Sequence, residues 1–347
     1  MRGWICMRVD SGRTADFDIA SRAGKRVGVL RVRELSVRIQ TDEHSFAVLD
    51  RISFDLERSG SLALMGESGS GKTTAALSLL RLLPPGAAAS GRVELSGRDL
   101  LQVPEGELAG VRGAGIAMVF QDALAALNPV MRIGAQISEA LRAHRPLSAA
   151  DARTEMERLL SDLGLEAETA RLYPHQLSGG MRKRALIATA LACGPSLLVA
   201  DEPTASLDTV AQAGIVEVFR RIREERGVAL LVATHDPSVA ARLCDRIAVL
   251  YAGRIVERAG AADLLERPRH PYTAGLWRSL PPAPGSAASA RLEPVPGSPP
   301  RPWALPSGCR FRERCPRADA QCAGREPELL DLGGGREVAC FHPLEAA

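Results

Sequence analysis

Residues 66–73 combine residue types and a spacing that can bind phosphate. They fit the pattern G-x-x-x-x-G-K-[ST] and are followed by Thr74; the matching residues are Gly66, Glu67, Ser68, Gly69, Ser70, Gly71, Lys72 and Thr73. In this pattern the backbone wraps closely around an anion, a lysine reaches the β and γ phosphates, and a hydroxyl ligates magnesium. The apolar run LALM precedes the segment and KTTAALSLLRLL follows it. This context of strand and then helix predicts a phosphate-binding loop.

Polar side chains end three other apolar runs. Asp201 and Glu202 end LLVADE, Gln121 follows IAMVF, and His235 follows VALLVAT. Ligands of open α/β sheets bind at the carboxyl ends of the strands, so these four side chains are expected at one edge of a sheet. There Asp201 can hold Mg²⁺, while Glu202 can orient or deprotonate a water molecule.

A second anion-binding helix start is predicted at residues 177–181, called here the signature segment. It reads Leu177-Ser178-Gly179-Gly180-Met181, and the helical sequence RKRALIATALAC follows it. A serine and two glycines at a helix N-terminus can bind an anion through backbone amides. The spacing leaves two uses open, a second anion in the same chain or a nucleotide held by a partner.

Four of the seven cysteines lie in the last 39 residues, at Cys309, Cys315, Cys322 and Cys340. The intervals contain five, six and seventeen residues, without the C-x-x-C hook of a zinc ribbon. Disulfides are disfavoured in a reducing cytosol, whereas four thiolates can hold zinc or an iron-sulfur cluster. Four unligated thiols are the alternative. Of the others, Cys6 is not expected to be a ligand, and Cys193 and Cys244 are expected to be small core residues on apolar helices.

The elements that position these residues follow from hydrophobic patterning. Alternating residues from Val29 onward and again around Val48 to Leu56 predict half-buried antiparallel strands. Short apolar runs at 62–65, 116–120, 197–200, 228–233 and 247–251 predict parallel core strands. Helices between them include one with a capping box of Ser148 and Asp151. The alternation predicts an α/β fold with a mainly parallel sheet, closed near residue 260 by the hairpin IAVLY-AG-RIVER as an edge.

Composition limits the remaining choices. The chain has 347 residues, 46% hydrophobic and 24% charged, and Lys plus Arg (44) against Asp plus Glu (41) gives a net charge of +3. This balance gives no support for nucleic acid as a partner. No apolar run reaches the roughly 18 to 20 residues of a membrane span, and the N-terminus lacks the apolar core of a signal peptide, so a cytosolic chain is expected. Residues 1–28 are expected to be a disordered extension, and the Pro-rich residues 281–308 an extended segment.

The motifs GESGSGKT, Gln121, LSGGM, LLVADE, Ser206-Leu207-Asp208 and His235 resemble, in order and spacing, the ATP-binding cassette (ABC) family. The resemblance covers about residues 29–260. It implies a P-loop NTPase fold at residues 29–262, with a RecA-like parallel-sheet core, an antiparallel β subdomain and a helical subdomain at about 122–180. It also implies that two cassettes face each other head to tail, so that the signature segment contacts ATP held by the other cassette.

The resemblance assigns roles to single residues. Glu202 polarises the attacking water, His235 holds the γ-phosphate, and Gln121 senses that phosphate. Thr73, Gln121 and Asp201 serve Mg²⁺, and Asp208 crosses the dimer interface. Met181 departs from the usual Gln at the end of the signature, and no Tyr stands where adenine usually stacks, so Phe46 or His44 is the candidate for that contact.

A narrower resemblance, to the ATPase subunits of dipeptide and oligopeptide permeases, rests on Leu127-Asn128-Pro129, YPHQLSGGMRKR and the C-terminal pieces HPYTAGL, SLPP, LPSGCRF, RCPRA and VACFHP. It implies a C-terminal extension at residues 263–347 whose four cysteines hold a [4Fe-4S] cluster, with Zn²⁺ as the alternative. It further implies an ATPase at the cytoplasmic face of the membrane that drives peptide import. The implied partners are a second ABC ATPase, in a favoured heterodimer, two membrane permease subunits and an extracytoplasmic binding protein. Import of nickel chelates, a soluble ABC ATPase acting on nucleic acid or ribosomes, and a regulatory cassette remain as alternatives.

Overall fold

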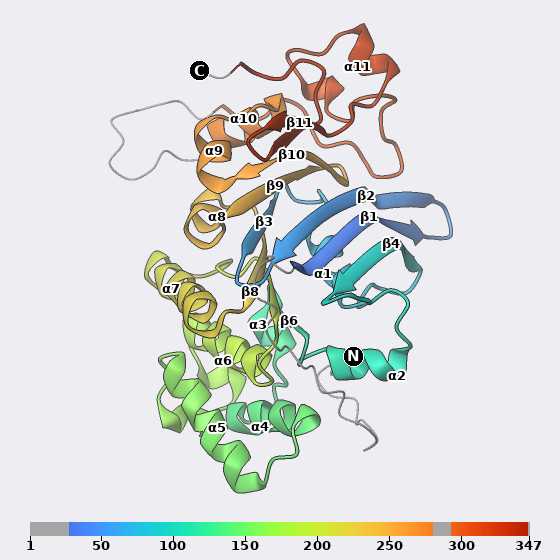
Figure 1. The fold of residues 1–347 in the computed structure, drawn as a ribbon. Helices are drawn as coiled ribbons and strands as arrows, with labels where there is room; N and C mark the ends of the chain where they lie inside the picture. Colours follow the sequence, from blue (N-terminus) through green and yellow to red (C-terminus); the bar gives the residue numbers. More distant parts are fainter. Residues whose placement is uncertain (1–27, 280–292, 346–347) are drawn as a thin grey trace. The chain divides into compact units, whose positions relative to one another are not determined.

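The computed structural model describes residues 28–279 and 293–345 (Figure 1). The chain forms two compact units. Unit 1 comprises Met1–Arg31, Asp55–Ser61 and Val93–Val232, and unit 2 comprises Val32–Phe54, Leu62–Arg92 and Ala233–Ala347. The predicted N-terminal extension, except for Gly28, and residues 281–292 of the predicted extended segment lie outside the described residues.

The sheet strands of unit 2 lie beside one buried strand, β3 (Ser61–Met65). Strand β3 is buried along its whole length and pairs in parallel with β9 (Arg246–Tyr251). Strand β9 pairs antiparallel with β10 (Arg254–Gly260), through a two-residue turn in which Ala252 and Gly253 have φ values of 45° and 84°. The predicted core strands at 62–65 and 247–251 and the predicted hairpin are therefore confirmed.

The prediction that this hairpin ends the sheet is wrong. Strand β12 (Arg336–Val338) pairs antiparallel with β10, with Glu257 opposite Val338, and β11 (Leu330–Gly333) pairs with β12 (Figure 1). The backbone N–H and C=O groups along that edge of β10 are thus paired with a strand that follows β10 by more than 70 residues. A three-residue strand carries too little pattern to be predicted from sequence. Part of the C-terminal extension therefore continues the sheet that contains β3, β9 and β10.

Two helices of unit 2 begin at clear N-terminal signals. Helix α8 is capped by Asp236, whose side chain accepts a hydrogen bond from Ser238 N, and α10 is capped by His270 with Pro271 at its first position. The helices are α1 (Lys72–Leu79), α8 (Pro237–Leu243), α9 (Ala261–Glu266), α10 (Pro271–Arg278), the 3-10 turn η3 (Arg312–Arg314) and α11 (Ala320–Gly324).

In unit 1, strands β8 (Ala229–Thr234), β7 (Leu197–Asp201) and β6 (Ile116–Val119) are neighbours in that order. Strand β6 runs parallel to β7, with Ile116 opposite Leu197 and Val119 opposite Ala200. All residues of these strands are buried, which explains their continuous apolar sequences. Three more of the predicted core strands are thereby confirmed, although the last two residues of β8 belong to unit 2.

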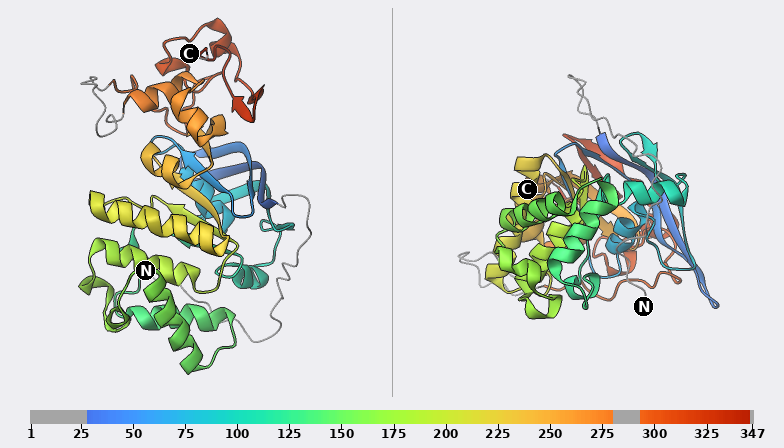
Figure 2. Two further views of the ribbon diagram at one scale, coloured as in Figure 1. Left: turned by 60° about the vertical axis from the view of Figure 1, so that its left-hand side comes forward. Right: turned by 90° about the horizontal axis from the view of Figure 1, so that it is seen from below.

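Three helices of unit 1 form a cluster. Helices α4, α5 and α6 pack on one another and stay together in every view (Figures 1 and 2). The predicted N-cap at Ser148 is present, because Ser148 Oγ accepts from Asp151 N at 3.1 Å, but Asp151 accepts from Ser148 Oγ at 2.7 Å where a capping box would have it accept from the Ser148 backbone N–H. The bounds are α2 (Glu105–Val111), α3 (Ala123–Ala126), α4 (Ile133–His144), α5 (Ala149–Asp162), η1 (Ala167–Arg171), η2 (Pro174–Gln176), α6 (Gly179–Leu191) and α7 (Thr209–Arg226).

A separate antiparallel sheet has the strand order β2-β1-β4-β5. Strands β1 (Gly28–Gln40) and β2 (Ser45–Glu57) are the two predicted alternating strands, and their buried residues include Leu35, Val37 and Phe54. Strands β4 (Ala87–Leu95) and β5 (Arg98–Asp99) were not predicted, since AAASG lacks alternation. Strands β1, β2 and β4 each have residues in both units.

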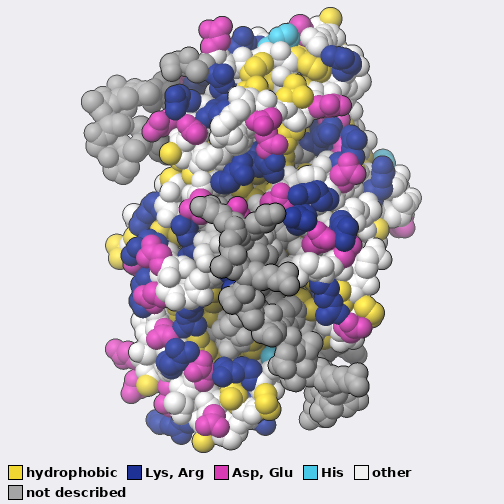
Figure 3. Space-filling model, in the orientation of Figure 1, with side chains coloured by type: hydrophobic (Ala, Val, Ile, Leu, Met, Phe, Trp, Pro, Cys, Tyr) yellow, Lys and Arg dark blue, Asp and Glu magenta, His cyan; other side chains and the backbone are white. Residues whose placement is uncertain are grey.

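The surface carries both signs of charge. On the face drawn in Figure 3, Lys and Arg side chains alternate with Asp and Glu, as the near-neutral composition implies. Within the described residues, none of the helices combines the length and the apolar character needed to cross a membrane.

Candidate functional site

The phosphate loop, residues 66–73, joins β3 to α1 in unit 2. Gly66, Gly69 and Gly71 have φ values of 152°, 79° and 109°, which L side chains rarely adopt. A Cβ on Gly66 would lie 2.3 Å from Leu250 O, and one on Gly71 would lie 2.6 Å from Leu49 Cδ2. Both glycines are therefore required by backbone conformation and by close packing. The predicted strand, loop and helix context is confirmed.

Lys72 and its neighbours fix the shape of this loop. Lys72 is buried, and its Nζ donates hydrogen bonds to Gly66 O at 2.8 Å and Glu67 O at 3.0 Å. The buried Ser70 accepts at its carbonyl from Gly253 N at 3.0 Å. Thr73, on the first turn of α1, is exposed, as a hydroxyl that reaches a metal ion must be.

His235 belongs to the same unit as the phosphate loop. It follows directly after β8 and is exposed, and the next residue, Asp236, caps α8. The hydroxyl of Thr234 accepts a hydrogen bond from Asp236 N at 3.1 Å, which fixes the turn around His235. The predicted position at the end of a strand is therefore present.

Both candidates for the adenine contact touch a third aromatic residue. The ring of Trp303 stacks on His44, with centroids 5.6 Å apart and an interplanar angle of 11°, and it lies 5.6 Å from Phe46 at 59°. Trp303 is 48% exposed, and the Arg301 guanidinium lies 5.9 Å from its ring centroid. Sequence reasoning missed Trp303, which lies more than 250 residues after Phe46. Its only signal was a tryptophan in an otherwise Pro-rich segment.

Unit 1 brings three of the predicted polar residues together. The parallel register of β6 and β7 ends with Val119 opposite Ala200, and Gln121 and Glu202 follow within two residues of the ends of these neighbouring strands. Asp201 is the buried last residue of β7. Glu202 has φ of 43°, a left-handed conformation that is uncommon for a non-glycine residue and is often found at functional sites.

A buried lysine that sequence reasoning missed fixes this strand end. Lys183 Nζ donates to the backbone oxygens of Gln121 at 2.7 Å and of Phe120 at 3.1 Å. Burial lowers the pKa of Lys183, and the nearby carboxylates of Asp122, Asp201 and Glu202 oppose this shift. The signal for it was weak: a lysine between two arginines on the helix that follows the signature segment.

The signature segment opens helix α6, as predicted. Ser178 is its N-cap, and Ser178 Oγ accepts from Met181 N at 3.3 Å, while Leu177 is buried. A Cβ on Gly179 would lie 3.2 Å from Leu207 Cδ2, and one on Gly180 would lie 3.4 Å from Ala211 Cβ. The glycines thus let the start of α6 pack against residues 207–211.

Asp208 caps the neighbouring helix. Its Oδ1 accepts from Ala211 N at 2.8 Å at the start of α7, and the Gln212 side chain donates to Leu207 O at 3.1 Å. The signature segment and the segment containing Asp208 are therefore held together as two adjacent helix N-termini. Such a pair is suited to face an anion or a partner surface.

The four C-terminal cysteines line one cavity, called here the cysteine cavity. Its volume is about 10 Å³, and Cys309, Cys315, Cys322 and Cys340 all contribute to its wall. Burial raises the pKa of three of these thiols, that of Cys340 to about 11. Four converging thiols are a donor set that zinc and iron-sulfur clusters share, and the volume is about that of one small ion or water.

The other two described cysteines lie elsewhere. Cys244 is buried at the end of α8, as predicted for a core residue. Cys193 lies beyond the end of α6 and is partly exposed, and its thiol donates to Ala140 O at 3.2 Å. The prediction that it sits on the helix as a core residue is therefore corrected, because α6 ends at Leu191. Cys6 is outside the described residues.

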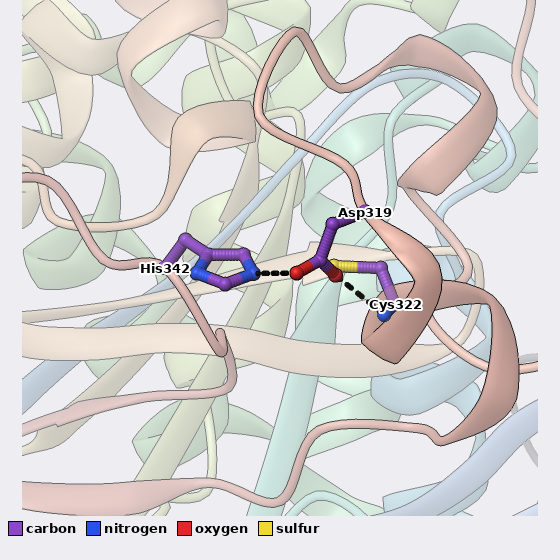
Figure 4. Close-up of side chains that lie close together, drawn as sticks. All are labelled: Asp319, Cys322 and His342. Carbon is purple, nitrogen blue, oxygen red and sulfur yellow. Dashed lines mark hydrogen bonds and ion pairs between the residues drawn. The ribbon is translucent and has the colours of Figure 1, made fainter.

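Next to the cysteine cavity, Asp319 and His342 form a pair that sequence reasoning missed. Ligand atoms of Asp319, Cys322 and His342 all lie within 4.8 Å of one another (Figure 4). His342 Nε2 is 2.9 Å from Asp319 Oδ2, within ion-pair distance but without hydrogen-bond geometry, and Asp319 Oδ1 accepts from Cys322 N at 3.0 Å. The only signals in the sequence were the short spacings of these two residues from Cys322 and Cys340.

Comparison with known proteins is consistent with this geometry. The family model described as ABC transporter matches residues 49–205, and the model described as the C-terminal region of oligopeptide/dipeptide transporters matches residues 256–322.

Relatives over nearly the whole chain bear related names. The chain is 39% identical to the oligopeptide transport ATP-binding protein OppD of Escherichia coli (91% of this chain, 94% of the relative) and 39% identical to the dipeptide transport ATP-binding protein DppD of the same organism (92% and 98%). It is 42% identical to DppD of Bacillus subtilis (90% and 94%).

Solved structures give the same result. The dimeric post-hydrolysis structure of the ATP-binding cassette MJ0796 bound to ADP and Pi matches with a TM-score of 0.61 and 27% identity over 67% of this chain and 98% of that one. CbiO1 from Clostridium perfringens, part of the ABC transporter complex cbiONQ, matches with a TM-score of 0.59 and 26% identity over 69% and 91%. The chain therefore belongs to the ABC transporter ATPases, in the family of oligopeptide and dipeptide transport ATP-binding proteins.

Proposed function

We propose that this chain hydrolyses ATP to drive the import of dipeptides or oligopeptides through separate membrane permease subunits. The observation that carries ATP hydrolysis is the parallel pairing of β6 with β7, because Gln121 and Glu202 follow within two residues of the ends of these neighbouring strands. The names of the relatives, which are oligopeptide and dipeptide transport ATP-binding proteins, support the choice of peptides.

In this proposal the phosphate loop binds the triphosphate. Lys72 is held by the carbonyls of Gly66 and Glu67, so its positive charge is fixed beside the loop where it neutralises the β and γ phosphates. His235 holds the γ-phosphate. Thr73, Gln121 and Asp201 are the residues that would hold Mg²⁺, which supplies positive charge to the phosphate oxygens.

Glu202 is proposed to activate the attacking water. Its carboxylate accepts a proton from the water as the oxygen–phosphorus bond forms, and the bond from the γ-phosphorus to the bridging oxygen breaks to release ADP. Gln121, which follows the neighbouring strand β6, orients the water and senses the γ-phosphate. The left-handed backbone of Glu202 aims its side chain differently from an ordinary strand residue.

A second cassette completes the proposed assembly. The signature segment and Asp208 would meet ATP held by the partner cassette, as their adjacent helix N-termini permit. The related cassette MJ0796 is described as dimeric. We propose a heterodimer with a related ATPase, together with two permease subunits and an extracytoplasmic binding protein, at the cytoplasmic face of the membrane. Residues 29–262 would form the cassette, with a helical subdomain at about 122–180, and residues 263–347 the C-terminal extension.

Transport into membrane vesicles that contain the assembled complex tests this function. The substrates are a labelled dipeptide, a labelled pentapeptide and a nickel–histidine chelate, with Glu202→Gln as the matched inactive control. ATP-dependent uptake of a peptide, absent in the control, is the expected result. Uptake of the chelate alone would establish the nickel alternative. ATPase activity stimulated by nucleic acid or ribosomes, with no uptake at all, would establish a soluble, non-transport ATPase.

For the adenine ring, we propose stacking on the aromatic group formed by Phe46, His44 and Trp303. Exposed aromatic faces of this kind bind planar bases, and β2, which carries Phe46, also contacts Gly71 of the phosphate loop through Leu49. Binding of ATP should quench the fluorescence of Trp303, and Trp277→Phe should leave that signal in place. A signal that survives Trp303→Phe would contradict the assignment.

The four cysteines are proposed to hold a structural metal centre, a [4Fe-4S] cluster, with Zn²⁺ as the alternative. A cavity of about 10 Å³ fits the single zinc ion as it stands, and the cluster would require the cysteine-bearing loops to move apart. The support is their convergence on the cysteine cavity, in a segment whose short helices and strands bury little apolar surface and so need a cross-link. Metal would bind the thiolate forms, which requires loss of the thiol protons.

Anaerobic purification followed by iron, sulfide and zinc analysis tests the metal proposal. Four irons and four sulfides per chain are expected, whereas one zinc per chain would select the alternative. Cys315→Ser should lower the metal content and the melting temperature, while Cys193→Ser, outside the cavity, is the matched control. A colourless protein without iron or zinc would refute any metal centre here.

A further inference from the structure

Glu67 brings a negative charge into the phosphate loop. It is the second residue of the loop, and its carboxylate would repel the phosphates of ATP if nothing neutralised it. Most of its side chain is buried, with 25% exposed. What compensates this carboxylate therefore matters for nucleotide binding.

The compensating charge comes from the C-terminal extension. Arg314 forms a bidentate ion pair with Glu67, with Nη1 to Oε2 at 2.7 Å and Nη2 to Oε1 at 2.9 Å. The Arg314 side chain is 5% exposed, so water screens this pair far less than a surface pair. A planar guanidinium paired in this way fixes the orientation of the carboxylate as well as its charge.

Arg314 is itself held rigidly. Its Nε donates to Pro296 O at 2.7 Å, and its Nη1 is 3.3 Å from the hydroxyl of Tyr251. Its guanidinium lies over the rings of Tyr251 at 5.7 Å and Phe311 at 5.9 Å. With these contacts, little side-chain freedom remains in Arg314 to be lost when a ligand reaches the loop.

A second residue of the extension holds the backbone of Glu67. The Glu67 N–H donates to the hydroxyl of Tyr272 at 2.9 Å. Tyr272 is fully buried on α10 and packs against Tyr251 and Phe311, with ring centroids 4.6 and 5.4 Å away. Its backbone N–H donates to His270 Nδ1 at 3.0 Å, which explains the role of the sequence HPY at this helix start.

We propose that Arg314 and Tyr272 are positioning residues for ATP binding, through which the C-terminal extension holds the phosphate loop in its anion-binding shape and neutralises Glu67. The inference rests on the proposed role of residues 66–73 as the nucleotide site. It gives the extension a part in nucleotide affinity that is separate from any role in holding a metal.

The test is the dissociation constant for ATP of the full chain, measured by equilibrium dialysis with labelled ATP. Arg314→Gln should weaken binding by about tenfold or more, because the Glu67 carboxylate is left buried and unpaired. The double variant Arg314→Gln with Glu67→Gln should recover most of that loss, since the repelling charge is gone. Tyr272→Phe, which keeps the ring, should weaken binding by about threefold.

The matched control is Arg310→Gln. Arg310 is a similarly buried arginine of the extension, but its ion-pair partners, Asp50 and Glu326, lie outside the phosphate loop. The Arg310→Gln variant should have a lower melting temperature, and its dissociation constant for ATP should stay within about twofold of that of the unmodified chain. Equal effects of Arg310→Gln and Arg314→Gln, or no recovery in the double variant, would overturn the proposal.

Two further variants separate the possible failures. If Arg314→Gln does not fold, Arg314→Lys and Tyr272→Phe carry the test, and unchanged affinity in both contradicts the proposal. Lys72→Ala should abolish ATP binding. If Lys72→Ala still binds ATP, the proposed nucleotide site is wrong. If Lys72→Ala abolishes binding while Arg314→Lys and Tyr272→Phe bind ATP normally, only the inference about Arg314 and Tyr272 fails.

Discussion

Glu202 is the residue on which the proposed chemistry depends most. It occupies the left-handed backbone region with φ of 43°, immediately after the buried Asp201. A residue other than glycine occupies that region only at a cost in free energy, which the surrounding structure must offset. Such residues concentrate at functional sites. The two acids thus differ in environment, since Asp201 is buried and Glu202 is half-buried.

Replacement of Glu202 by Gln should separate ATP binding from hydrolysis. Gln keeps the size of the side chain but cannot accept the proton of the attacking water, so kcat should fall by about 100-fold or more, as for loss of a general base. The dissociation constant for ATP should change little. Steady-state phosphate release and equilibrium dialysis measure the two quantities, and a kcat near the original value would exclude Glu202 as the base.

At the residue scale, local patterns predicted the groups that lie within one motif. The spacing of its glycines predicts the phosphate loop. Polar residues at the ends of apolar runs predict that Gln121 and Glu202 lie at strand ends. Lys183, Trp303 and Arg314 could not be found in this way. Each acts through a contact with residues far away in the chain, 62 residues in the bond from Lys183 to Gln121 and 247 in the pair of Arg314 with Glu67.

At the scale of elements, the helix starts were more predictable than the strand partners. Ser148 caps α5 through a reciprocal bond with Asp151, which the sequence marks by residue type and spacing. No local sequence pattern predicts the pairing of β12 with β10, because strand order depends on tertiary packing and not on local propensity.

Helix α4 carries a titrating residue at its C-terminal end. His144 is partly buried, and a Cβ on Gly113 would lie 2.8 Å from its Nε2, so the ring has little room. Burial lowers the pKa of His144 below 6.5. Its position at a helix C-terminus would favour the charged form, but burial dominates.

The stability of the folded chain should therefore depend on pH through His144. The unfolded chain binds a proton at this group near pH 6.5, and the folded chain binds it only at lower pH, so the free energy of unfolding should decrease as pH falls through 6.5. Urea unfolding at pH 7.5 and pH 5.5 measures this. His144→Gln should reduce the dependence without abolishing it, because burial also lowers the pKa of His270, to about 3. An unchanged slope in His144→Gln would contradict the assignment.

At the scale of the whole molecule, the proposed nucleotide-binding residues fall into two groups. The phosphate loop lies in unit 2, and the signature segment with its neighbouring Asp208 lies in unit 1. In the proposed head-to-tail pair each cassette contributes one part to each nucleotide. Association should then depend on the γ-phosphate, since ATP bridges the two chains and ADP bridges them less well.

Association of cassettes should be detectable with the Glu202→Gln variant, which cannot consume the ATP. Sedimentation of this variant mixed with the partner ATPase should show a dimer with ATP and monomers with ADP. Ser178→Arg, which places a long side chain at the start of α6, should prevent the dimer while ATP still binds. Dimers that form equally with ATP, with ADP and without nucleotide would contradict an ATP-bridged pair.

The contact of Arg314 with Glu67 also bears on how the protein is made. A ribosome releases residue 67 long before residue 314, and domains generally begin to fold during synthesis. For the time needed to add 247 residues, the nascent phosphate loop has no Arg314 to neutralise Glu67. On the proposal above, a chain cut short before residue 314 should contain every motif of the cassette and bind ATP more weakly than the full chain. On the proposed role of Arg314, full affinity for nucleotide would then be reached only when the polypeptide is nearly complete.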